Sequence, residues 1–114
     1  MTTPTVQQLS ADVSVAPQLD PAAMAWAAQA GFKSVINNRP DFEGGPDQPT
    51  DAALESAARE AGLAYAFLPV NPGSHTPEQI ARFAELLQQL PKPILAFCRS
   101  GTRSGNLFHA ATGR

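Results

Sequence analysis

Residues 94–104 have the sequence ILAFCRSGTRS, in which the only cysteine of the chain, Cys98, ends an apolar run. A short polar loop follows, then Arg103, Ser104 and a further apolar stretch, and this order predicts a strand, a tight loop and a helix. A loop in this position directs backbone N–H groups at one point, which the positive end of the following helix also faces. Such a point stabilises a thiolate, and the planar guanidinium of Arg103 can bind an oxyanion. The stretch therefore predicts that Cys98 is a nucleophile in an anion-binding loop.

A cysteine at the end of an apolar run is, taken alone, more often a small core residue than a reactive one. The loop favours the reactive interpretation, because a buried core cysteine has no need of arginines on both sides of a Ser-Gly-Thr sequence. We predict catalytic roles for Cys98, Arg103 and Ser104. The residues predicted to bind an anion in the same loop are Arg99, Ser100, Gly101 and Thr102.

Length and composition indicate one globular domain spanning residues 1–114, with a polar start over residues 1–11 that we expect to be frayed. Hydrophobic residues make up 43% of the chain, which argues against disorder throughout. The net charge of -2 gives no sign of nucleic-acid binding, and no apolar run is long enough to span a membrane. The N-terminus lacks the features of a signal peptide, and a single cysteine excludes an internal disulfide or a multi-cysteine zinc site. We therefore expect a cytoplasmic, reduced setting and no metal or cofactor.

Hydrophobic periodicity and capping residues divide the chain into alternating strands and helices. The clearest helix start is Thr76-Pro77-Glu78-Gln79, where a threonine cap, a proline at the first position and a glutamine at the third form a capping box. The alternation predicts an α/β fold with a mostly parallel sheet flanked by helices in three layers. The predicted elements, in order, are a short edge strand at 13–15, a helix at 20–31, a buried strand at 33–37, a helix at 50–62, a strand at 64–68, a helix at 76–90, a strand at 94–97 and a final helix after residue 103.

Loops at the carboxyl ends of parallel strands surround the site in folds of this kind. Asn38, Arg39 and Asp41 follow a predicted buried strand, so they can lie beside the cysteine loop as anion ligands. Alternatively, Arg39 and Asp41 pair with each other or with backbone groups and only hold the loop in place. The loop after the next strand adds Asn71 and His75 as candidate binding residues, although a histidine in a Gly-Ser turn is more often solvated.

Four residues separate Cys98 from Arg103, a spacing that resembles the loop of single-domain rhodaneses, which are sulfurtransferases. Tyrosine and dual-specificity phosphatases carry five residues between the corresponding cysteine and arginine. The rest of the chain resembles the small phosphatase-like domain that occurs in bacteria alone or beside β-lactamase-fold hydrolase domains. This resemblance implies the protein-tyrosine-phosphatase fold and a β-lactamase-fold partner in sulfide metabolism. The segments that carry it are SVINNRPD (34–41), AGLAY (61–65), LPVNPG (68–73), TPEQ (76–79) and the cysteine loop.

The phosphatase resemblance implies that the Cys98 thiolate attacks phosphorus while the loop N–H groups and Arg103 hold the phosphate oxygens, and that Ser104 helps the thiolate leave. Phosphatases of this superfamily place a proton-donating aspartate in the loop after the preceding strand. Here that loop, residues 68–75, contains no aspartate or glutamate. Asn71 stands near the expected position, and an amide cannot donate a proton as an acid. His75 is then the remaining candidate acid.

Sulfur transfer needs no such acid, because no alkoxide leaves. Cys98 would carry a sulfane sulfur as a persulfide, and Arg99 and Arg103 would attract anionic donors such as thiosulfate or glutathione persulfide. The short loop and the missing acid make sulfur transfer our leading interpretation, with a phosphatase acting on a phosphoester as the alternative. A non-catalytic anion-binding or redox-sensing module, in which Cys98 is oxidised reversibly, also stays open.

Overall fold

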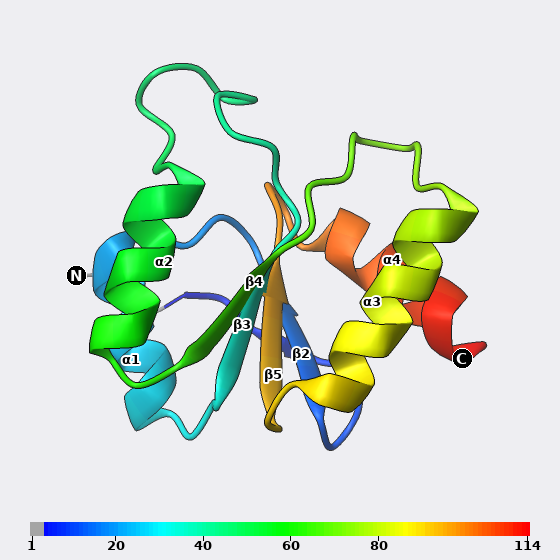
Figure 1. The fold of residues 1–114 in the computed structure, drawn as a ribbon, viewed down its shortest axis with the longest axis horizontal. Coiled ribbons are helices and arrows are strands. Elements are labelled where there is room, and N and C mark those ends of the chain that lie inside the picture. The colour runs from blue at the N-terminus through cyan, green and yellow to red at the C-terminus, as the bar shows by residue number, and fades with distance from the viewer. Residues whose placement is uncertain (1–3) are drawn as a thin grey trace.

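One five-stranded sheet runs through the centre of the computed structural model, which describes residues 4–114 (Figure 1). The strand order is β1-β2-β5-β3-β4; the last four of these run parallel to one another, and β1 is antiparallel to β2. The mostly parallel sheet predicted from the sequence is confirmed. The strands are β1 (Gln7–Gln8), β2 (Val13–Ala16), β3 (Ser34–Asn37), β4 (Ala64–Phe67) and β5 (Ile94–Phe97).

The register of the strands brings their carboxyl ends to one edge of the sheet. Phe97, the last residue of β5, lies opposite Ala16 of β2 and Asn37 of β3, and Asn37 lies opposite Phe67 of β4. The loops that leave these strands therefore start side by side. Figure 1 shows the long loops after β3 and β4 above that edge. This edge is where the cysteine loop lies, because Cys98 directly follows β5.

Helices cover both faces of the sheet, which gives the three predicted layers (Figure 1). α1 (Pro21–Gln29) and α2 (Asp51–Glu60) pack together on one face, and α3 (Pro77–Gln89) and α4 (Thr102–Thr112) pack together on the other.

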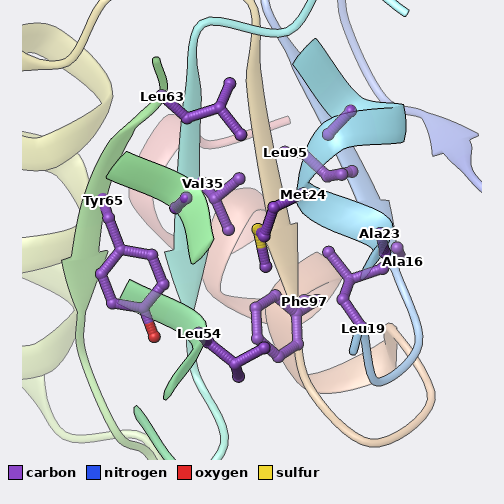
Figure 2. Packing of buried hydrophobic residues seen from close by; sticks show 12 residues of the cluster. Ala16, Leu19, Ala23, Met24, Val35, Leu54, Leu63, Tyr65, Leu95 and Phe97 are labelled. Carbon is purple, nitrogen blue, oxygen red and sulfur yellow. The ribbon is translucent and has the colours of Figure 1, made fainter. Parts of the chain in front are cut away.

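Both faces of the central strand β5 are buried, as its unbroken apolar sequence predicts. Leu95 and Phe97 belong to the core under α1 and α2, where Figure 2 shows them close to Met24 and Leu54. The alternate residues of β5, Ile94 and Ala96, belong to the core under α3 and α4. Phe83 of α3 and Phe108 of α4 also pack in this core. The strand that leads into Cys98 is therefore buried at every position.

The predicted helix starts are confirmed in detail. The Asp20 carboxylate accepts a hydrogen bond from the Ala23 N–H, and the Thr50 hydroxyl accepts one from the Ala53 N–H. Thr76 and Gln79 form both hydrogen bonds of the capping box, at 2.8 Å and 3.1 Å. These contacts join residues three positions apart, so the sequence specifies them locally.

The start of the chain differs from its prediction. β2 is an inner strand and not an edge strand, because Gln7–Gln8 pairs with it on its outer side. Part of the segment predicted to be frayed is thus hydrogen-bonded; residues 1–3 lie outside the described structure. A tight turn allows the pairing, in which the Ser10 hydroxyl accepts hydrogen bonds from the N–H groups of Asp12 and Val13. None of the helices within residues 4–114 has the length and apolarity needed to cross a membrane.

Candidate active site

Cys98 lies between β5 and the loop that opens α4, and the residue is only 1% exposed. The Gly101 N–H donates a hydrogen bond to the Cys98 sulfur at 3.1 Å. Gly101 has φ +92°, and a Cβ at this position would stand 3.4 Å from the backbone carbon of Ala16. Glycine supplies the left-handed conformation, whereas the contact of such a Cβ with β2 would be an ordinary van der Waals one. The strand, tight loop and helix predicted around Cys98 are confirmed.

Arg103 is buried one residue into α4 and makes three hydrogen bonds. Its Nη1 and Nη2 donate to the two carboxylate oxygens of Glu43 at 3.0 Å and 3.1 Å, and Nη1 also donates to the Val70 carbonyl at 2.9 Å. Its Nε makes no hydrogen bond within residues 4–114. The guanidinium is therefore fixed through its terminal nitrogens, with its Nε edge available to an oxyanion.

Glu43 is a site residue that the sequence analysis missed. Its carboxylate also accepts a hydrogen bond from Arg39 Nε at 2.8 Å, so it joins two arginines. Burial by itself raises the pKa of the Glu43 carboxyl, but hydrogen bonds and charge from Arg103 and Arg39 outweigh burial and lower that pKa below its ordinary value. The only sequence signal for Glu43 is its position in the loop after β3, because residue spacing does not link Glu43 to Arg103.

Arg39 and Asp41 do not pair with each other. Arg39 binds Glu43 and donates from Nη1 to the Gln18 side chain at 3.0 Å. Asp41 accepts a hydrogen bond from the Asp51 N–H at 2.7 Å, so it caps the start of α2. Of the two predicted roles, Asp41 has the structural one, whereas Arg39 belongs to the site.

Asn38 ties three segments together at the buried edge of the sheet, and none of its surface is exposed. Its backbone N–H donates to Phe97, and its backbone carbonyl accepts from Val70. Its side-chain Nδ2 donates to the Leu68 carbonyl at 3.0 Å, and its Oδ1 accepts from the Ser104 hydroxyl at 2.8 Å. All four hydrogen-bonding groups of this residue are used, so Asn38 positions the site and does not face an anion.

The Ser104 hydroxyl proton points toward Asn38. The bond from Asn38 Nδ2 to Leu68 fixes which side of the amide carries the oxygen, and that oxygen can only accept. Ser104 therefore donates to Asn38 and has no proton left to donate to the Cys98 sulfur. The role predicted for Ser104 in assisting the thiolate is not formed in this arrangement.

A pocket of about 530 Å³ opens beside the cysteine loop. The predicted residues Asn71 and His75 are exposed and lie outside its lining, so the structure does not bring them to the site. Within residues 4–114 no group of three His, Cys, Asp or Glu side chains could hold a metal ion. The lining residues are Arg39, Glu43, Gly44, Pro72, Arg99, Ser100 and Arg103.

The fold and the cysteine loop together define a phosphatase-like domain with the protein-tyrosine-phosphatase fold. The model of one family, the phosphatase-like domain of beta-lactamase hydrolase-like proteins, matches residues 5–113. The chain belongs to this family. The resemblance seen in the sequence is thereby confirmed.

Known proteins support the same placement. The chain is 43% identical over 81 residues to the beta-lactamase hydrolase-like protein of Xylella fastidiosa Temecula1, a match that covers 71% of this chain and 19% of the relative. The chain thus spans about a fifth of the length of the curated relatives it matches. A structure from Neisseria meningitidis Z2491, named provisionally as a phosphatase, is 33% identical with a TM-score of 0.82 and matches over 89% of this chain and 71% of its own. The structure of a mutant form of Tk-PTP has a TM-score of 0.73 at 14% identity, over 96% of this chain and 74% of its own, which shows the fold alone.

Proposed function

We propose that this domain is a cysteine-dependent phosphatase that forms a phosphocysteine at Cys98. The observation that carries the proposal is the 3.1 Å hydrogen bond from the Gly101 N–H to the Cys98 sulfur at the start of α4. A sulfur in this position faces an N–H donor and the positive end of a helix, both of which favour a thiolate and then the oxyanions of a bound phosphate. Arg103 lies on the same turn and offers its Nε edge to those oxyanions.

The reaction has two displacement steps at phosphorus. The Cys98 thiolate attacks the phosphorus, an S–P bond forms, and the bond to the leaving oxygen breaks with its electron pair going to that oxygen. Water then attacks the phosphorus, and the S–P bond breaks with its electron pair returning to sulfur. Phosphate is released and the thiolate is restored.

The family model describes a phosphatase-like domain, and the Neisseria meningitidis structure is named provisionally as a phosphatase. These descriptions support phosphatase chemistry over our leading interpretation of sulfur transfer. One observation still favours sulfur transfer as a second candidate: only four residues separate Cys98 from Arg103. A short loop makes a smaller cradle, which suits a single terminal sulfur. Both candidates use the same thiolate, so the group that becomes attached to Cys98 distinguishes them.

The test is intact-protein mass spectrometry after an acid quench, with p-nitrophenyl phosphate in one sample and thiosulfate in another. We expect the phosphate ester to add one phosphoryl group to the wild type and none to Cys98→Ser, with steady release of phosphate by the wild type alone. A sulfur adduct that a thiol acceptor removes, without phosphate release, would establish sulfur transfer instead. Failure of both reagents to modify Cys98 would leave the domain as a non-catalytic binding module.

A further inference from the structure

The pocket beside the cysteine loop, which Arg99, Ser100 and Arg103 line, offers no proton to a leaving group. Glu43 is the only carboxylate in its lining, and three hydrogen bonds from Arg39 and Arg103 occupy that carboxylate. Because two guanidinium groups bind it, Glu43 is held in its ionised form and cannot act as an acid. The loop 68–75 contains no acidic residue, and His75 lies outside the lining.

A missing acid restricts which phosphoryl compounds can react. An alcohol leaves as a strongly basic alkoxide unless a positioned acid protonates it, and such an acid contributes about 10²–10⁴-fold to the rate. A phosphate or carboxylate group leaves as a stable anion and needs no proton. The site therefore favours substrates whose leaving group departs with a negative charge.

Two cations line the same pocket in addition to Arg103. The Arg99 side chain is exposed and makes no hydrogen bond or ion pair within residues 4–114, while its backbone carbonyl accepts from the Gln18 N–H at 3.2 Å. Arg39 is held by Glu43 and Gln18 through Nε and Nη1. Its Nη2 makes no hydrogen bond in the described part of the chain. A Cβ on Gly44 would stand 2.6 Å from that nitrogen, so the glycine leaves room for it. The Nη2 group of Arg39, whose guanidinium is held in place, and the exposed guanidinium of Arg99 therefore remain for a second anion.

We propose that the preferred substrates are phosphoryl anhydrides, namely diphosphates or acyl phosphates, and that Arg39 and Arg99 bind the leaving anion. This inference rests on the proposed phosphatase function and names its substrate class. The departing phosphate or carboxylate gains stabilisation from the two guanidinium groups in place of a proton.

The reaction balances without an acid. Cys98 sulfur bonds to the terminal phosphorus, and the bridging P–O bond breaks with its electron pair staying on the leaving phosphate or carboxylate. Water then attacks the phosphocysteine, and the S–P electron pair returns to sulfur. Both protons of that water leave with the product as dihydrogenphosphate, so no group of the protein changes its protonation state.

The first experiment compares kcat/KM for phosphate release from four compounds at one pH and ionic strength: inorganic pyrophosphate, acetyl phosphate, p-nitrophenyl phosphate and glycerol 2-phosphate. We expect at least one anhydride to exceed glycerol 2-phosphate by about 100-fold or more. Which anhydride is used distinguishes diphosphates from acyl phosphates. Comparable values for glycerol 2-phosphate and the anhydrides would overturn the inference, and so would turnover of p-nitrophenyl phosphate with neither anhydride. Failure of all four compounds would overturn the proposed phosphatase function itself.

A second experiment separates binding of the leaving anion from the intrinsic reactivity of anhydrides. Arg99→Gln removes one of the two cations, and we expect kcat/KM for the preferred anhydride to fall about tenfold more than for p-nitrophenyl phosphate, whose leaving group has no carboxylate or phosphate. Arg82→Gln removes the same charge from the exposed face of α3 and is the matched control, with equal effects on both compounds. Equal effects of Arg99→Gln on both compounds would overturn the role of Arg99.

Discussion

The Glu43 carboxylate accepts hydrogen bonds from both terminal nitrogens of Arg103, across 60 positions of sequence. The arginine side chain is 9% exposed and that of the glutamate 19%, so water screens the pair only in part. Arg103 is the residue that we expect to bind the substrate oxyanion, and a guanidinium needs a fixed orientation to bind through two nitrogens. The loop after β3 therefore sets the geometry of a residue that α4 carries.

Glu43→Gln should make the orientation of the Arg103 guanidinium less fixed. We expect vanadate or phosphate to bind about tenfold more weakly, because a charged, bidentate contact is replaced by a single neutral acceptor. Unfolding should become easier by about 1–3 kcal/mol, since a mostly buried guanidinium loses its counterion. Titration calorimetry and urea denaturation measure these two effects.

Glu85→Gln is the matched control for this substitution, because it removes an exposed carboxylate from α3 outside the pocket. We expect it to leave oxyanion binding unchanged. Glu43→Asp keeps the charge on a shorter side chain and should recover part of the affinity. Tighter oxyanion binding by Glu43→Gln would contradict the positioning role, since it would mean that the carboxylate competes with the ligand for Arg103.

The stability that Glu43 contributes should depend on pH. Its pKa is lower in the folded protein than the ordinary value of 4.5, so the unfolded chain binds its proton more readily. The contribution is therefore complete above pH 4.5 and is lost as the pH falls below 4.5 and through the folded value. Urea denaturation of the wild type and Glu43→Gln at several pH values should show a constant difference near neutrality and a shrinking one in acid. A difference that grows on acidification would exclude the ion pair as its source.

The Asn38 side chain should matter through the fold. Asn38→Ala leaves the Leu68 carbonyl and the Ser104 hydroxyl without their buried partner, so we expect a loss of about 2–4 kcal/mol in the free energy of unfolding. Ser104→Ala removes one of those two bonds and should cost about 1 kcal/mol. In a double-mutant cycle the two substitutions should couple by about 1 kcal/mol.

The Ser104→Ala variant also tests the role of the Ser104 hydroxyl in catalysis. Because its proton is donated to Asn38, we expect Ser104→Ala to reduce kcat for p-nitrophenyl phosphate by less than tenfold. A hundredfold loss of kcat with unchanged stability would show instead that the hydroxyl turns to Cys98 during the reaction. Stopped assays at saturating substrate distinguish these two results.

The features that the sequence predicted are those that neighbouring residues determine. The Thr76 capping box joins positions three apart, and the Cys98 loop places a donor and a sulfur three residues from each other. The alternation of strands and helices along the chain predicted the parallel sheet, because parallel strands are joined by crossover helices. These parts of the fold and site follow from local geometry.

The features that were missed depend on where distant segments meet. The contact between Glu43 and Arg103 exists only because the loop after β3 reaches the start of α4, and no local pattern in the sequence records that path. Asn38 was predicted to bind an anion, because an amide can donate to phosphate as well as to a carbonyl. Its hydrogen bonds to Leu68 and Ser104, which only the tertiary structure shows, give it a structural role. Burial of a polar residue among long-range partners is decided by the tertiary structure.

Two glycines, Gly101 and Gly105, lie around the start of α4. Gly101→Ala should be destabilising by about 1–2 kcal/mol, because φ is +92°, a left-handed conformation that strains a residue with a Cβ. Relief of that strain would move the Gly101 N–H away from the Cys98 sulfur, so oxyanion binding should weaken as well.

Gly105→Ala is the matched control, since Gly105 lies within α4 and its Cβ would meet no atom within 4 Å outside the backbone of its own helix. This second substitution should stabilise the protein by up to about 1 kcal/mol, as alanine does in helices, and should leave oxyanion binding intact. Equal effects of the two substitutions on stability and on binding would show that the left-handed conformation at Gly101 is not needed for the site.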